Sequence, residues 1–452
     1  MSQTEENRNE LFATQPVPVA LRKMIVPAAV SQIIVLIYNM ADTFYIGRTG
    51  DPYMLAGASL ILPVFNMLMC LSSLAGVGGG TLISRLLGAG EEAEARKVSV
   101  FSFYLGLALS VLYSAGLGLL MEPALRFLGA GDTIIVYARQ YAFCVIVLGG
   151  IPTVLSNVLS NLVRSVGLSK EAGFGITLGA VLNIILDPAF MYLVLPDGQQ
   201  VLGVGIATFV SNCISFLYFL GVLWKIRGTT AVTIHPAAGL PGPRSIGQVF
   251  WVGIPSAVTS FLFDLDYMVI DKLMVTYSEE ALAAIGIVLK VERLPLNVGI
   301  GICQGMVPLV AYNCAAGNQK RMDQAVRLSL LTGLVVGAGS ILLYEAFAPW
   351  IIRVFISDAQ TVGLATSFIR IRILGTPLMF LSFFTVYLFQ GFGKGGISLV
   401  LAIVRWAVFN IPMICLLNYL VGMYGIIWSP IVGDTFTVLV SLYAYRTQKP
   451  VL

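Results

Sequence analysis

Charged residues are scarce in this sequence. Asp, Glu, Lys and Arg make up 11% of its 452 residues, whereas apolar residues make up 57%, and soluble domains usually carry about 25% charged residues. This shortage excludes an ordinary soluble domain. The six cysteines show no CxxC spacing, so the sequence predicts neither a disulfide framework nor a zinc site. We interpret them as small, buried apolar residues.

Sequence motifs of enzymes and ATPases are also missing. The segment GFGKGG at 391–396 matches GxGxxG, but it joins two apolar segments instead of following a strand. Lys394 is followed by Gly395 rather than Ser or Thr, so there is no Walker A loop and ATP is not the expected energy source. The single histidine, His235, is interpreted as a solvated loop residue, and no catalytic constellation for hydrolysis can be assembled. We therefore expect neither an enzyme nor a bound cofactor.

Long apolar runs fill most of the chain, and each is long enough for one helical crossing of a bilayer. The sequence predicts an all-α integral membrane protein with twelve transmembrane helices, at approximately 24–46, 55–83, 98–121, 133–163, 171–195, 201–226, 247–271, 281–313, 325–347, 361–390, 396–418 and 422–444. Strands of a membrane barrel would alternate polar and apolar residues, whereas these runs are continuously apolar. Residues 1–16 lack a basic segment leading into an apolar core, so no cleaved signal peptide is expected.

Lysine and arginine are distributed unevenly between the two sides of these helices. Most of the 27 lie in the terminal segments or the even-numbered loops, whereas the opposite loops carry only Arg48, Arg126, Lys272 and Arg353. Because positively charged loops stay in the cytoplasm, we expect a multi-pass protein of the cytoplasmic (inner) membrane with both termini cytoplasmic. This topology explains the net charge of +4 without a nucleic-acid partner.

The chain also repeats itself. Pro27 in VPAAVSQ matches Pro255 in IPSAVTS, and Pro152 in GIPTVL matches Pro377 in GTPLMF at nearly the same offset. A six-helix unit duplicated in tandem begins both copies on the same side, so the sequence predicts two parallel six-helix repeats that move against each other across a central cavity. The expected parts are a cytoplasmic N-terminal tail (1–23), an N-lobe of helices 1–6 (24–226), a Gly- and Pro-rich cytoplasmic linker (227–244), a C-lobe of helices 7–12 (245–446) and a C-terminal tail (447–452).

Two aspartates interrupt the apolar runs of the N-lobe, Asp42 in the first predicted helix and Asp187 in the fifth. A carboxylate in such a segment is costly unless it is protonated, paired or bound to a cation. Asn183 precedes Asp187 by one helical turn, and Thr208 lies at a matching depth in the sixth helix. We interpret these four residues as a cation-coupling site for H+ or for Na+, with Asp42 and Asp187 as the ligands of Na+ in the second case. The alternative is a structural polar network between helices.

The C-lobe has its own charges, namely Asp264 and Asp266 in LFDLDYM and Lys290, Glu292 and Arg293 in IVLKVERLPL. They indicate either a second ion or substrate site, or a network of salt bridges that holds the seventh and eighth helices together. We favour the network because charges of both signs are present, and we expect Asp264 and Lys290 to be close enough in depth to pair. Three arginines elsewhere in the apolar runs, Arg139, Arg370 and Arg405, are expected to be paired or to extend toward the membrane surface rather than to bind substrate. Arg372 is not assigned a role.

Four polar residues of the N-lobe are candidates for contact with a substrate. Tyr38 lies one turn before Asp42, and Asn157 and Asn161 share one face of the fourth helix. Tyr141, on the same helix, is a weaker candidate. The alternative is that these side chains form hydrogen bonds between helices, as polar residues of membrane bundles often do.

Several segments of the chain resemble the multidrug and toxic compound extrusion (MATE) transporters. The segments are GVGGGTLISRLLGAGEEAEARK at the end of helix 2, LVRSVGLSK after helix 4, NIILDPAF in helix 5 and PLVAYNCAAGNQKRM after helix 8. The resemblance implies export of amphipathic, usually cationic, small molecules across the lipid bilayer in exchange for Na+ or H+, with the cation held at Asp42, Asn183, Asp187 and Thr208. We expect the protein to work as a monomer. A flippase for lipid-linked precursors, from the same superfamily, and a channel are the alternatives; the acidic site, the twelve spans and the repeat favour an exporter.

Overall fold

The computed structural model describes residues 10–196, 198–356 and 358–450. Parts of both predicted tails, 1–9 and 451–452, lie outside these ranges. The described chain is helical and contains no strand. The helices are η1 (Glu10–Thr14), α2 (Val17–Gly47), α3 (Pro52–Leu60), α4 (Leu62–Gly88), α5 (Glu92–Leu119), α6 (Met121–Phe127), α7 (Ile134–Ala142), η2 (Phe143–Leu148), α8 (Gly150–Ser165), α9 (Ser169–Ala189), η3 (Phe190–Val194), α10 (Gln200–Lys225), η4 (Pro236–Ala238), α11 (Pro243–Met274), α12 (Glu279–Ala315), α13 (Gln319–Arg353), α14 (Ala359–Ile373), α15 (Thr376–Gly391), α16 (Gly395–Ile403), η5 (Val404–Asn410), α17 (Ile411–Val421) and α18 (Met423–Gln448).

These helices confirm the prediction of an all-α membrane protein. Ten of the described segments are single spans that are long and apolar enough to cross a bilayer, and two bent helix pairs bring the number to the expected twelve. The bent pairs are Ile134–Leu148 with Gly150–Ser165, at 47°, and Ala359–Ile373 with Thr376–Gly391, at 50°. We predicted each of these spans as one continuous helix, and the structure corrects that. Both breaks precede the matched prolines, Pro152 and Pro377, whose rings cannot continue a helix from the preceding turn.

The start of the first long helix also differs from the prediction. We placed the N-terminal tail at 1–23, but α2 already begins at Val17. Pro16 caps this helix with an extended backbone, and Pro18 stands within its first turn, where a missing N–H is tolerated. Arg22 and Lys23 therefore lie on a helix rather than in a loop.

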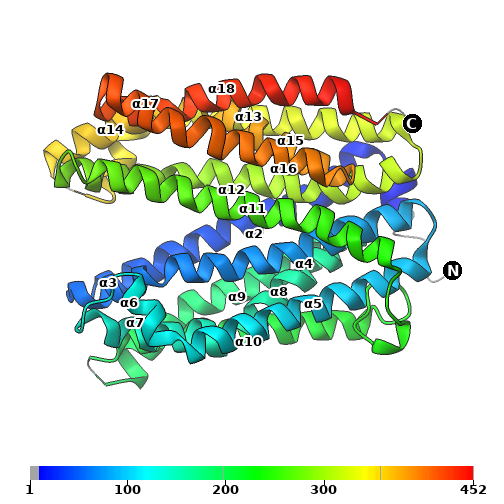
Figure 1. The fold of residues 1–452 in the computed structure, drawn as a ribbon, viewed down its shortest axis with the longest axis horizontal. Coiled ribbons are helices and arrows are strands. Elements are labelled where there is room, and N and C mark those ends of the chain that lie inside the picture. Colours follow the sequence, from blue (N-terminus) through cyan, green and yellow to red (C-terminus); the bar gives the residue numbers. More distant parts are fainter. Residues whose placement is uncertain (1–9, 197, 357, 451–452) are drawn as a thin grey trace.

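The helices form two bundles that meet along one seam. Figure 1 shows α5, α8, α9 and α10 on one side of the molecule and α13, α15, α17 and α18 on the other, with α2, α4, α11 and α12 between them. The bundles touch mainly through two helix pairs, α2 with α12 and α4 with α11. In the predicted numbering these pairs are helix 1 with helix 8 and helix 2 with helix 7, as expected for two related halves. Both termini lie at the same end of the molecule (Figure 1).

Glycines let the two bundles approach closely at this seam. A Cβ added to Gly301 of α12 would lie 2.4 Å from the Cα of Ala29, and one added to Gly305 would lie 2.6 Å from the Cα of Ile25. At the second helix pair, a Cβ added to Gly253 of α11 would lie 2.1 Å from a backbone oxygen of α4. Any side chain at these positions would force the helices apart, so the seam depends on small residues.

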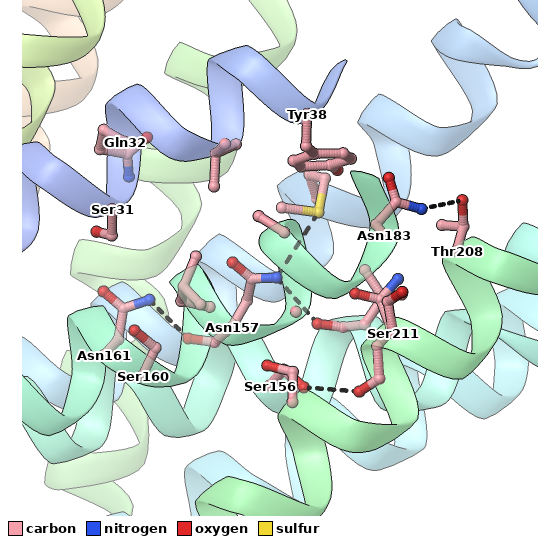
Figure 2. Close-up of a pocket in the computed structure, with 18 of the residues that line it drawn as sticks. Ser31, Gln32, Tyr38, Ser156, Asn157, Ser160, Asn161, Asn183, Thr208 and Ser211 are labelled. Carbon is pink, nitrogen blue, oxygen red and sulfur yellow. Dashed lines mark hydrogen bonds between the residues drawn. The ribbon is translucent and has the colours of Figure 1, made fainter. Parts of the chain in front are cut away.

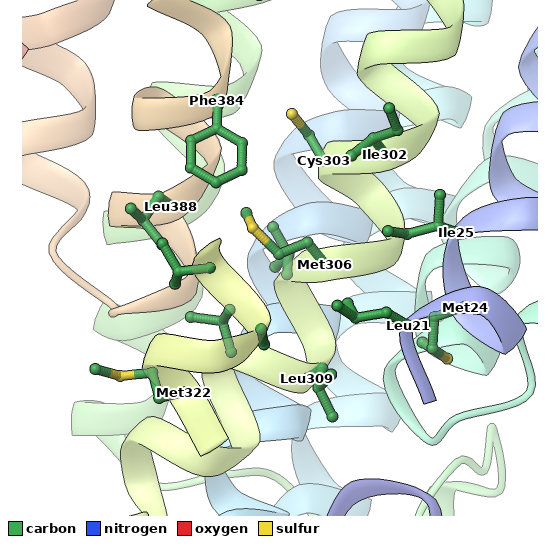
Figure 3. Close-up of a cluster of buried hydrophobic side chains, with 14 of the residues drawn as sticks. Leu21, Met24, Ile25, Ile302, Cys303, Met306, Leu309, Met322, Phe384 and Leu388 are labelled. Atoms are coloured by element: carbon green, nitrogen blue, oxygen red, sulfur yellow. The ribbon is translucent and has the colours of Figure 1, made fainter. Parts of the chain in front are cut away.

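An apolar cluster continues this contact toward the end where the termini lie. Figure 3 shows three side chains of α2 beside α12, with Phe384 and Leu388 of α15 on the other side of α12. The buried cluster includes Leu21, Met24 and Ile25 of α2 together with Ile302, Cys303, Met306 and Leu309 of α12. The two bundles are therefore in close apolar contact at the terminal end of the molecule.

The linker between the two halves is packed against α5. The hydroxyl group of Ser99 donates to the carbonyl of Thr233 at 2.9 Å, and one carboxylate oxygen of Glu94 accepts hydrogen bonds from the backbone of Gly242 at 2.8 Å and the hydroxyl of Ser245 at 2.7 Å. His235 is exposed in this linker, as expected. The connection between the halves is thus held on the N-lobe side.

Candidate functional site

The structure brings the two N-lobe aspartates together. α2 packs against α9, and the carboxyl groups of Asp42 and Asp187 lie within hydrogen-bonding reach of each other. Asp42 is 9% exposed and Asp187 is fully buried. Two adjacent carboxylates repel each other, and neither is solvated here, so the pair requires a shared proton or a bound cation to be stable.

Asn183 and Thr208 complete this acidic site. The amide of Asn183 donates to Asp187 at 3.4 Å and to the hydroxyl oxygen of Thr208 at 3.1 Å, and the Thr208 hydroxyl donates to the carbonyl of Val204 at 3.0 Å. Three buried oxygens are left without a hydrogen-bond partner among the residues that the structure describes: Oδ1 of Asp42, Oδ1 of Asn183 and Oδ2 of Asp187. Buried oxygens that accept no hydrogen bond can coordinate a hard cation or bind a proton.

A cavity of about 140 Å³ adjoins the acidic site within the N-lobe. It lies between α2, α4, α8, α9 and α10, and α12 contributes one side chain, Gln304. Figure 2 shows Tyr38, Asn183 and Thr208 at one end and Ser31, Gln32, Ser160 and Asn161 at the other. The acidic site and the cavity therefore share Asn183 and Thr208, and Tyr38 stands where the two meet.

Three of the four predicted substrate contacts line this cavity, namely Tyr38, Asn157 and Asn161. The two asparagine amides donate within their own helix, Asn157 to the carbonyl of Thr153 and Asn161 to that of Asn157, both at 2.9 Å. Tyr141 is not part of the lining of the cavity. It is buried in an apolar cluster with Val145, although its hydroxyl is close enough to Asp42 to interact with it electrostatically.

The sequence analysis missed most of the polar lining of the cavity. The cavity residues of α8 are Thr153, Ser156, Asn157, Ser160, Asn161 and Arg164. They recur every three or four residues, which is the spacing of one helix face, and this stripe can be read from the sequence. Gln32 and Gln304 gave no comparable signal, because each is a single polar residue whose partner lies on a distant helix.

In the described part of the chain, only Glu292 of the five predicted C-lobe charges takes part in a buried ion pair, and its partner is not the predicted one. Glu292 of α12 accepts from Arg372 of α14 at 2.6 Å, and Asp434 of α18 accepts from Arg405 of η5 at 2.9 Å. All four side chains are at most 5% exposed. These pairs join α12 to α14 and η5 to α18, whereas we expected a network between the seventh and eighth helices, α11 and α12.

The expected pair of Asp264 and Lys290 does not form in the described part of the chain. Lys290 is exposed, whereas Glu292 is buried two residues later, because residues two apart on a helix point to nearly opposite sides. Arg293 stacks over the ring of Tyr267, with 5.0 Å to the ring centroid. Asp266 is buried, and its Oδ1 has no hydrogen-bond partner among the described residues.

Known proteins resemble this chain over nearly its whole length. The family model MatE matches residues 27–189 and 255–416. The multidrug export protein MepA of Staphylococcus saprophyticus is 30% identical over 417 residues, which cover 92% of this chain and 91% of the relative. MepA of Staphylococcus aureus is 28% identical over 431 residues, which cover 95% and 94%.

Solved structures agree with this fold. A crystal structure of MATE in complex with MaL6 superposes with a TM-score of 0.92 at 22% identity, covering 99% of this chain and 98% of the other. The outward-facing conformation of a multidrug resistance MATE family transporter of the MOP superfamily gives a TM-score of 0.91 at 22% identity, with the same coverage.

Proposed function

Because this chain belongs to the MatE family, the multidrug and toxic compound extrusion transporters, we propose that it is a secondary active antiporter. It exports amphipathic, mainly cationic, small molecules in exchange for Na+ or H+. It acts as a monomer in the cytoplasmic membrane with both termini in the cytoplasm. No resident cofactor is needed for this activity, because the energy comes from the gradient of the coupling ion.

The observation that carries this proposal is the acidic site beside the cavity. Asp42 and Asp187 hold buried, unsatisfied oxygens that a coupling ion would satisfy. Asn183 and Thr208 belong both to this site and to the cavity wall. A cation that binds at the aspartates therefore changes the wall that a substrate touches, and this shared wall is a physical basis for exchange.

The seam supports alternating access. The bundles are packed together at the end that carries the termini, and α2 runs from that contact to Asp42 near its other end. Pro27 interrupts the hydrogen-bond ladder of α2 between these two points, so the outer part of the helix can bend relative to the inner part. Ion binding at Asp42 would act on the seam through this helix.

A flippase for lipid-linked precursors is expected to have a strongly basic central cavity. The cavity here is lined mainly by neutral hydroxyl and amide groups, with Arg164 as its cation, so the exporter is the proposal that we retain.

The test is reconstitution into liposomes with a fluorescent cationic dye. Na+ and pH gradients are imposed separately, and we expect one of them to drive accumulation of the dye against its concentration gradient. Dye movement that ignores both gradients would reject antiport.

A further inference from the structure

Arg164 stands at the inner end of the cavity without an acidic partner. It lies in the last turn of α8 and is 4% exposed. Its Nη1 donates to Oε1 of Gln304 at 3.2 Å, and its Nη2 donates to the hydroxyl oxygen of Ser160 at 3.4 Å. Its Nε has no partner among the described residues. Both partners are neutral, so the charge of this guanidinium is not compensated.

The other buried arginines of the chain show what is missing. Arg372 and Arg405 are each buried against a carboxylate. A buried cation loses its hydration, and neutral partners restore only part of that loss. The carbonyl groups at the end of α8 favour a positive charge there, but this effect is much smaller than the cost of burying an unpaired ion.

Arg164 also borders open space on two sides. It lines the 140 Å³ cavity and a smaller one that includes Tyr387 of the C-lobe. Its side chain therefore borders space that a bound molecule can enter. A planar guanidinium with spare N–H groups binds a carboxylate through two parallel hydrogen bonds.

The opposite end of the same cavity adjoins the acidic site of Asp42 and Asp187. Gln32, which donates to Gln304 at 3.1 Å, marks the Arg164 end, and Tyr38 marks the end beside Asp42. Figure 2 shows Gln32 and Tyr38 at different ends of the polar lining. They are six residues apart on α2, which corresponds to roughly 9 Å along the helix.

On the basis of the proposed exporter function, we propose that Arg164 is the carboxylate-binding subsite of the cavity. The substrates it selects are zwitterionic amphiphiles whose carboxylate lies roughly 10 Å from a cationic group. The carboxylate accepts hydrogen bonds from the spare N–H groups of the Arg164 guanidinium, and the cationic group lies toward Tyr38.

A matched pair of dyes tests this assignment. One dye is a rhodamine ethyl ester, which is a fixed cation, and the other is the free acid of the same rhodamine, which is a zwitterion. Binding is measured by fluorescence anisotropy on the full-length protein in nanodiscs without any gradient, for the wild type and for Arg164→Gln, Arg164→Lys and Arg370→Gln. The last variant is the control, because Arg370 is an exposed arginine that does not line the cavity.

We expect Arg164→Gln to weaken binding of the free acid about tenfold or more and binding of the ester less than about twofold. Arg164→Lys keeps the charge but loses the planar fork, so it should weaken the free acid by several-fold. Arg370→Gln should leave both affinities unchanged. If Arg164→Gln does not fold, Arg164→Lys decides the question alone.

Equal weakening of both dyes by Arg164→Gln and Arg164→Lys would overturn the subsite and assign Arg164 a structural role. Unchanged binding of both dyes would overturn it as well. Gradient-driven export of the ester by the wild type is measured separately. Its failure would reject antiport, whereas the affinity ratio would still decide on the subsite.

Discussion

At the scale of single residues, the position of a buried charge decides what it does. Asp42 and Asp187 face each other without a counter-charge, whereas Glu292 faces Arg372. The first arrangement is stable only with a cation or a proton, and the second is already neutral. We therefore propose that coupling belongs to the N-lobe and that the buried ion pairs of the C-lobe are structural.

The pair of Glu292 and Arg372 gives a direct test of that structural role. Glu292→Gln removes one partner and leaves a buried guanidinium unpaired, which costs about 3–5 kcal/mol. We expect a clear fall in the melting temperature of the purified protein. Glu345→Gln is the control, because Glu345 pairs with Arg370 on the exposed surface, and such pairs contribute about 0–1 kcal/mol. Equal melting temperatures for the two variants would contradict the assignment.

The sequence identified the residues of the acidic site but not the partners in the C-lobe. Asp42, Asn183, Asp187 and Thr208 could be placed together because they are polar residues at a similar depth in three apolar runs. The partner of Glu292 lies 80 residues away on α14. Choosing it requires the rotation and tilt of both helices, which no local pattern contains.

At the scale of elements, the contact between α2 and α12 is held by glycine. A Cβ at Gly305 would lie 2.6 Å from the Cα of Ile25, and backbone atoms cannot move aside as the end of a side chain can. We expect Gly305→Ala to lower the melting temperature. Gly286→Ala, on the same helix, is the control because a Cβ there meets no atom within 4 Å. It should be neutral or stabilising by up to about 1 kcal/mol, since alanine favours a helix over glycine. A destabilisation of equal size by both variants would contradict close packing at the seam.

The short helix η1 gives a second test at this scale. The ring of Phe12 stacks on Tyr312 with 5.2 Å between centroids, and its carbonyl accepts from Asn313 and Arg321, both at 3.2 Å. The side chains of Leu11 and Phe12 also lie beside Gly167, just after the end of α8. Because Tyr312 belongs to the C-lobe and Gly167 to the N-lobe, η1 bridges both halves at the terminal end. Phe12→Ala should lower the melting temperature and expose the N-terminal segment to limited proteolysis. Glu10→Ala, at an exposed position of the same helix, should do neither; identical cleavage in both variants would argue against this anchor.

The elements that the sequence predicted less well are those shaped by tertiary packing. The apolar runs predicted twelve spans, but an apolar run looks the same whether it is straight or bent by 47° or 50°. The prolines at 152 and 377 were recognised as a repeat, and their bending effect follows from the missing N–H and the ring clash. The sequence of η1, residues 10–14, has no pattern that distinguishes a helix packed against the bundles from an unpacked tail.

At the scale of the whole molecule, the two bundles are predicted to change their separation at the end away from the termini. Spin labels at the outer ends of α2 and α11, near residues 48 and 275, should show at least two distance populations whose ratio shifts with substrate or cation. Labels on α2 and α12 within the seam provide the comparison. A single outer distance that neither substrate nor cation changes would contradict alternating access.

The central claim is that the Asp42–Asp187 site couples the ion gradient to export. The gradient supplies about 2.3 kcal/mol per charge per 100 mV, and a protein that cannot bind the ion cannot use it. The measurement is gradient-driven dye efflux in proteoliposomes for the wild type, Asp42→Asn, Asp187→Asn and the exposed control Asp132→Asn. We predict wild-type efflux for the control and loss of gradient-dependent efflux for both site variants, with dye binding and folding retained. Gradient-dependent efflux at the wild-type rate by Asp42→Asn and Asp187→Asn would contradict the account.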